Sequence, residues 1–136
     1  MKYLTGRQAL NLPCLLSTNG DWHHCNMIWK FNSLKIQESN DSVFKDYGIE
    51  LDRKIPENSG LFAVANHIRV ILDYLEKGQF DGIRGFRNDY ICNDEYMIEI
   101  FKKVTLLQTK SFWNKIDEIM GLEYFSKWLK FKKDIF

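Results

Sequence analysis

The segment LFAVANHIRVILDYLEK, residues 61–77, decides how the chain is organised. Its apolar residues recur at steps of three and four, which lines up one stripe of an α-helix, and polar residues such as Arg69 and Asp73 occupy the opposite face. Ser59 is placed to cap the first turn, and Gly78 suits the left-handed residue that ends many helices. We therefore predict one central core helix, whose apolar stripe is Leu61, Val64, Ala65, Ile68, Ile71, Leu72 and Leu75.

The C-terminal half is predicted to be helical as well. Residues 95–108 repeat apolar positions at helical spacing, with acidic residues early and lysines late, an order that complements the helix dipole. A helix over residues 112–120 is expected to end at Gly121, and a last helix covers residues 122–133.

The N-terminal third alternates apolar and polar residues over short runs, as strands do. Residues 25–31 and 34–38 flank an Asn-Ser pair, which predicts a β-hairpin, and a short strand is expected near residues 48–51 within an acidic loop at 39–60. The predicted fold is α+β: three to four helices packed on a small N-terminal antiparallel sheet or hairpin, with a predominantly helical C-terminal half. We expect one domain, residues 1–136.

Composition limits the class of protein. The 136 residues are 45% hydrophobic and 27% charged, which is typical of a soluble globular domain, and the formal net charge of +1 argues against a general nucleic-acid-backbone binder. No apolar run reaches the roughly 20 residues that span a bilayer. Three cysteines, Cys14, Cys25 and Cys92, cannot all pair within one chain, which favours a reducing compartment. The expected location is the cytoplasm, with no membrane partner.

The run DWHHC at residues 21–25 concentrates side chains that bind metals. Its adjacent histidines, His23 and His24, point in different directions in most backbones, and a complete site would need His67 or Cys92 brought in by the fold. Ordinary turn and strand residues are the favoured interpretation. We predict no metal site and no cofactor.

Residues 80–95 interleave Arg84 and Arg87 with aromatic and acidic residues. Arginine beside an aromatic ring can bind phosphate and stack on a base, but acidic neighbours oppose a polyanion. The favoured interpretation is a charge-paired loop that docks two helices. A nucleic-acid-binding module that uses these arginines, Phe86 and the C-terminal lysines is an alternative that we do not favour.

An enzyme is the main alternative to a binding protein. A small phosphate-handling hydrolase or nuclease would use His23, His24 or His67 together with Arg84 and Arg87. The chain has no phosphate-binding P-loop, dinucleotide fingerprint, nucleophile elbow or HExxH pattern. We therefore assign no catalytic residue and lean against an enzyme.

The last predicted helix has a wider apolar surface than a helix with one wet face needs. Either it is wedged between two parts of the fold, which is the favoured interpretation, or it carries part of a partner interface. For an interface we expect Tyr124, Trp128 and Phe131 as anchors, because aromatic residues dominate binding hot spots, with Arg84 and Arg87 as further contacts.

Several strings resemble a family of small, poorly characterised bacterial proteins encoded beside nucleotidyltransferase-type toxins. They are YLTGRQALNL (3–12), GDWH (20–23), YGIE (47–50), VANHIRVILDYL (64–75) and CNDEY (92–96). The resemblance spans most of the chain but contains no motif of known chemical role. It implies an intracellular bacterial protein, antitoxin-like or accessory, that binds another protein.

The leading hypothesis is therefore a non-enzymatic interaction module, whose partner would be a nucleotidyltransferase-type toxin. Acidic residues at 39–57 could then occupy a basic groove on that partner by charge complementarity. Self-association through the last helix is equally compatible with the pattern.

Overall fold

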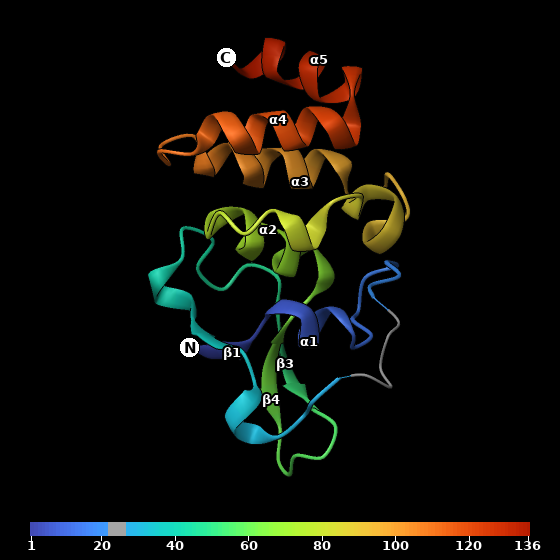
Figure 1. The fold of residues 1–136 in the computed structure, drawn as a ribbon, viewed down its shortest axis with the longest axis vertical. Coiled ribbons are helices and arrows are strands. Elements are labelled where there is room, and N and C mark those ends of the chain that lie inside the picture. The colour runs from blue at the N-terminus through green and yellow to red at the C-terminus, as the bar shows by residue number, and fades with distance from the viewer. Residues whose placement is uncertain (22–26) are drawn as a thin grey trace.

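The computed structural model describes residues 1–21 and 27–136. Its elements are stacked along the long axis in the order sheet with α1 (Gly6–Leu10), then α2 (His67–Glu76), then the C-terminal helices, as Figure 1 shows. α5 (Ser126–Ile135) lies farthest from the sheet. The fold is α+β with a predominantly helical C-terminal half, as the sequence predicted.

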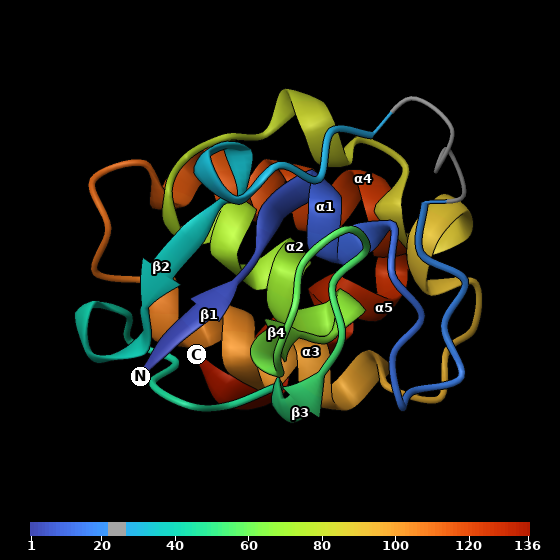
Figure 2. The same cartoon turned by 90° about the horizontal axis from the view of Figure 1, so that it is seen from below.

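The sheet has four short strands in the order β2-β1-β4-β3, and Figure 2 shows it from below with α2 behind it. β1 pairs antiparallel with β2, and β3 pairs antiparallel with β4, but β1 and β4 are parallel, so the sheet is mixed rather than antiparallel. The strands are β1 (Lys2–Leu4), β2 (Ile36–Glu38), β3 (Ile49–Arg53) and β4 (Phe62–Ala65).

The prediction of a hairpin over residues 25–38 is wrong for the residues that the structure describes. Phe31–Ser33 is a 3-10 turn, and β2 pairs with β1 instead of with a preceding strand. The reason is Gln8, whose side-chain amide donates to the carbonyls of Ile28 (3.1 Å) and Ser33 (2.8 Å) and accepts from the backbone of Lys35 (2.8 Å). These bonds satisfy backbone groups that a hairpin partner would otherwise need to pair.

The predicted central helix is divided in two. Its first residues form β4, because β1 and β3 offer strand partners on both sides, and α2 starts only after Asn66. Asn66 rather than Ser59 is the N-cap, and its side chain accepts from the backbone of Arg69 at 2.8 Å. Gly78 has a φ of 72°, which confirms the predicted left-handed residue after the helix.

The C-terminal helices differ from the prediction mainly at their ends. Gly121 does not end the helix as predicted: it is not among the glycines with positive φ, and α4 continues through it to Tyr124. The chain then breaks at Phe125 and begins α5. The remaining helices are α3 (Met97–Val104) and α4 (Trp113–Tyr124), with a π-helical turn at Arg87–Ile91 and 3-10 turns at Ser39–Asp41, Asp81–Ile83 and Thr105–Leu107.

α2 separates two hydrophobic cores. Val70 packs into the core under the sheet, with residues such as Leu4 and Val64. The other side of α2 contributes to the larger C-terminal core, where Phe101 and Trp128 are fully buried. Among the described residues, none of the helices combines the length and apolar character needed to cross a membrane.

The predicted acidic loop at 39–60 is fixed to α2. Arg69 is fully buried and donates to the backbone carbonyls of Lys45 and Tyr47, both at 2.6 Å. Glu76 accepts bonds from the hydroxyl of Ser42 (2.7 Å) and the backbone of Val43 (2.9 Å). The loop contains β3, which confirms the short strand predicted near residues 48–51.

Candidate interaction surface on the last helix

One side of α5 is anchored in the protein. Trp128 is fully buried, its ring centroid lies 5.2 Å from that of Phe101, and its indole nitrogen donates to Asp117 of α4 at 2.7 Å. Lys132 donates to the same carboxylate oxygen at 2.7 Å. Because the indole and the ammonium share one carboxylate, the rotation of α5 about its axis is fixed.

The other side of α5 is apolar and exposed. Large apolar side chains are exposed on α5 and at both of its ends, and we call this group the apolar stripe. Its members and their exposed fractions are Leu122 (60%) in the last turn of α4, Phe125 (66%) between the two helices, Leu129 (56%) on α5 and Phe136 (58%) after it. The Phe136 ring also packs edge-on against Trp113 of α4, at 6.4 Å between ring centroids.

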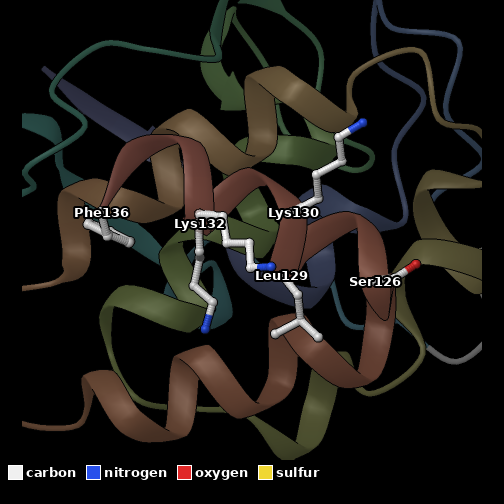
Figure 3. A pocket seen from close by; sticks show the side chains of 6 residues that line it. Ser126, Leu129, Lys130, Lys132 and Phe136 are labelled. Carbon is white, nitrogen blue, oxygen red and sulfur yellow. The ribbon is translucent and has the colours of Figure 1, made fainter.

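A shallow depression of about 660 Å³ lies along this stripe. Figure 3 shows Ser126 at one end of it, Phe136 at the other and Leu129 between them, all carried by α5 and the residue that follows it. The lining is completed by Lys130, Lys132 and Lys133. An apolar floor with a basic rim is the composition of many protein-binding surfaces.

The charge of α5 is strongly positive. It carries four lysines and one aspartate, whereas the whole chain has a net charge of only +1. Lys127 is paired with Asp94 at 3.1 Å and Lys132 with Asp117. Within the part of the chain that the structure describes, Lys130 and Lys133 form no ion pair, so their charge faces solvent beside the depression.

Phe125, between α4 and α5, has a strained backbone. Its φ of 52° and ψ of −129° lie in a region that glycine adopts readily and side-chain-bearing residues rarely do. Such a conformation costs about 1–3 kcal/mol. The strain lies at the junction of α4 and α5, and the Phe125 side chain there is 66% exposed.

The three predicted aromatic anchors differ in how far they are buried. Tyr124 and Trp128 are buried inside the chain, so α5 would have to move before either could contact a partner. Phe131 is half-buried, stacked on Trp128 at 5.8 Å between ring centroids. The exposed residues Leu129 and Phe136 were not among the predicted anchors, although their helical spacing from Phe125 was visible in the sequence.

The two predicted arginines have different surroundings. The Arg84 side chain is 70% exposed and lies 3.7 Å from Asp81. Arg87 donates two bonds to Asp94 (3.2 and 3.0 Å) and a third to the carbonyl of Glu123 (3.0 Å). The bonds from Arg87, together with Lys127, lower the pKa of Asp94. Arg87 thus belongs to the charge-paired loop that docks helices.

The predicted histidine candidates are not gathered in one cleft by any contact of the described residues. His23 and His24, with Cys25, lie outside the described residues. His67 is buried, with its ring nitrogens facing Thr18 and the carbonyl of Leu12. Arg87 instead bonds to Asp94 and to the carbonyl of Glu123. Within residues 1–21 and 27–136, no group of three or more His, Cys, Asp or Glu side chains could hold a metal ion.

Comparison with known proteins gives no match: neither a family model, nor a curated protein, nor a solved structure is significantly similar to this chain.

Proposed function

We propose that the protein is a non-enzymatic interaction module that binds an acidic, amphipathic segment of a partner protein on the exposed face of α5. The observation that carries the proposal is that Phe125, Leu129 and Phe136 of the apolar stripe are exposed close to Lys130 and Lys133, which form no ion pair with any residue that the structure describes. The backbone strain at Phe125 supports it, because strained residues that a fold retains are often functional.

The charge of the surface specifies the chemistry of the partner. Lys130 and Lys133 favour carboxylates opposite them, while Leu129 and Phe136 favour apolar side chains. A helix or strand with apolar residues on one face and acidic residues at its edges has both features. A symmetric pair of α5 helices would instead place lysines near lysines, which argues against self-association through this face.

For the partner class we propose a nucleotidyltransferase-type toxin inside a bacterial cell. The support for this step is the resemblance of strings such as VANHIRVILDYL (64–75) to antitoxin-like proteins. The contact is proposed at α5 rather than at the acidic loop, because two of the loop's carboxylates are already used. Glu50 is paired with Arg53 and bonded to the backbone of Leu15, and Asp46 accepts from Ser39.

The test compares three tagged proteins as bait in the cells that encode them. These are the wild type, the α5 variant Lys130→Glu/Lys133→Glu and the control Lys30→Glu/Lys102→Glu. The control makes the same change in net charge at exposed lysines outside α5. Circular dichroism establishes that all three are folded, and light scattering gives the stoichiometry of each complex.

We expect the wild type and the control to retain one stoichiometric partner, and the α5 variant to bind it more weakly by on the order of tenfold or more. Equal retention by all three proteins, or a complex that contains only this chain, would contradict the proposal. Mass spectrometry then identifies the partner. If the partner is not a nucleotidyltransferase, the proposed partner class is wrong, while the assignment of α5 as the binding surface still holds.

A further inference from the structure

Three side chains that the sequence does not bring together meet at the start of α2. Cys14 and Thr18 lie on the segment that follows α1, and His67 is the first residue of α2. The Cys14 sulfur lies 3.4 Å from the Thr18 hydroxyl oxygen, which in turn lies 2.7 Å from Nδ1 of His67. The hydroxyl thus connects a thiol to an imidazole.

The orientation of His67 determines which nitrogen can exchange a proton. Its Nε2 lies 2.6 Å from the carbonyl of Leu12, and because a carbonyl only accepts, Nε2 keeps its hydrogen. Gly20 packs against the ring so closely that a Cβ there would lie 2.6 Å from Cε1. The ring is therefore held in one orientation, and Nδ1 is the atom that gains or loses a proton.

The same atoms can bond in two protonation states. In the neutral state the Cys14 thiol donates to Thr18, whose hydroxyl donates to Nδ1 of His67. In the charged state Nδ1 donates to the Thr18 hydroxyl, which donates to the thiolate. Because Thr18 can reverse both bonds, the proton can pass from Cys14 to His67 without a change in the fold.

The surroundings shift both groups towards the charged state. Burial by itself raises the pKa of Cys14, but the bonds from His67 and Thr18 outweigh burial and lower this pKa. Burial by itself lowers the pKa of His67, but Cys14, the Leu12 carbonyl and Glu50 outweigh burial and raise it. Of the nearby charged groups on β3, Glu50 accepts from the backbone of Leu15, and Arg53 donates to Glu50 and to the carbonyl of Pro13.

We propose that Cys14 is a peroxide-reactive thiolate, held ionised by Thr18 and His67. The sulfur of Cys14 attacks one peroxide oxygen, so that an S–O bond forms as the O–O bond breaks. Sulfur loses two electrons and the peroxide is reduced. The leaving hydroxide takes the proton that the His67 imidazolium supplies through Thr18, which leaves a sulfenic acid, a neutral imidazole and water.

Cys14 is half-buried, so a molecule as small as hydrogen peroxide can reach it while large thiols are hindered. Cys92 provides an internal comparison. Its thiol is exposed and donates to the carbonyl of Asn88 at 2.9 Å, a bond that involves no base. Accessibility alone would make Cys92 the faster thiol, whereas the proposal makes Cys14 faster.

The experiment uses two variants with one cysteine each: Cys25→Ser/Cys92→Ser keeps Cys14, and Cys14→Ser/Cys25→Ser keeps Cys92. Each is treated with hydrogen peroxide near neutral pH, and sulfenic acid is trapped with dimedone and counted by mass spectrometry. We expect Cys14 to react about tenfold faster than Cys92 or more, and iodoacetamide labelling of Cys14 to reach half its maximum at lower pH. In urea the difference disappears.

Thr18→Val in the variant that keeps Cys14 tests the connection to His67. We expect a slower reaction with peroxide and a labelling midpoint shifted to higher pH. His67→Gln should shift the midpoint in the same direction. If Cys14 reacts no faster than Cys92 in the folded protein, or if a folded Thr18→Val variant keeps the original rate and midpoint, the proposal is wrong. The comparison of Cys14 with Cys92 does not depend on whether the Thr18→Val and His67→Gln variants fold.

Discussion

An aspartate anchors a helix in the N-terminal half and another does so in the C-terminal half, and these two anchors differ in burial. Asp73 of α2 is only 4% exposed and accepts from Arg69 (2.8 Å), from Tyr3 (2.7 Å) and from Thr5 (2.7 Å). Asp117 of α4 is 32% exposed and accepts from Trp128 and Lys132. Each carboxylate accepts from one cation, and Asp73 has two neutral donors where Asp117 has one, but only Asp73 is removed from water.

The difference shows how the two halves are stabilised. In the N-terminal half, the pair of Arg69 and Asp73 is buried, and burying a charge costs free energy unless it is hydrogen-bonded. The hydrogen bonds of this pair therefore specify how the sheet, the loop and α2 fit together. The C-terminal half depends on aromatic packing instead. Phe101 lies within 4.8–5.2 Å, centroid to centroid, of Tyr124, Trp128 and Phe131.

The largest effect is expected from Asp73→Ala. The substitution leaves the guanidinium of Arg69, whose side chain is fully buried, without its counterion, and we expect a loss of about 3–5 kcal/mol in the free energy of unfolding. Urea denaturation followed by circular dichroism measures it.

The double variant Arg69→Met/Asp73→Leu provides the control, because it removes both charges together. We expect it to be more stable than Asp73→Ala. A loss below about 1 kcal/mol for Asp73→Ala would mean that water reaches the pair and that burial does not separate the two halves.

The pair formed by Arg69 and Asp73 also marks the limit of the sequence analysis. Helical spacing placed both residues correctly on one polar face of the helix. It could not show that this face is buried, because Tyr3 and Thr5, which donate to the carboxylate, lie 70 and 68 residues away in the sequence. For the same reason the first turn of the predicted helix became β4, since its strand partner β1 is distant in sequence.

The candidate surface was predicted in part. The wide apolar surface of the last helix was visible in the sequence, and so was the choice between a wedged helix and an interface. Spacing could not decide that Trp128 faces inward while its neighbour Leu129 faces solvent, because the helix is apolar around most of its circumference. The meeting of Cys14 with His67 depends on the path of a loop, for which no periodic pattern exists.

A smaller effect, of opposite sign, is expected from Phe125→Gly. Glycine relieves the strain at φ 52°, and after the entropy that it adds to the unfolded chain we expect a net gain of about 1 kcal/mol. The side chain is 66% exposed, so little packing is lost. Thermal and urea unfolding measure the change.

Phe125→Ala is the matched control, because it removes the ring but keeps the strained conformation. We expect no comparable gain from it. Both variants should bind the α5 partner more weakly, since both lose the exposed ring. If alanine stabilises as much as glycine, exposure of the ring rather than backbone strain is the cause, and the strain no longer supports a binding role.

The smallest effect is expected from Asp117→Asn, and it should depend on pH. Burial by itself raises the pKa of Asp117, but the bonds from Lys132 and Trp128 outweigh burial and lower this pKa below 3.8. A carboxylate with a lowered pKa in the folded state stabilises the fold fully above its unfolded pKa and loses this contribution as the pH falls through the folded value. Near pH 6 we expect the free energy of unfolding of the wild type to exceed that of the variant by less than about 1 kcal/mol, because the Asp117 carboxylate is partly hydrated.

Urea unfolding of both proteins between about pH 6 and pH 2 measures this difference, which should shrink below about pH 4. Asp81→Asn, at a carboxylate whose side chain is 99% exposed, should cause no measurable change. If Asp117→Asn lowers the free energy of unfolding as much as Asp73→Ala does, or if its effect grows as the pH falls, then Asp117 is shielded from water. The C-terminal half would then depend on a buried charge as the N-terminal half does, and aromatic packing would not be enough to hold α5 with its apolar stripe facing solvent.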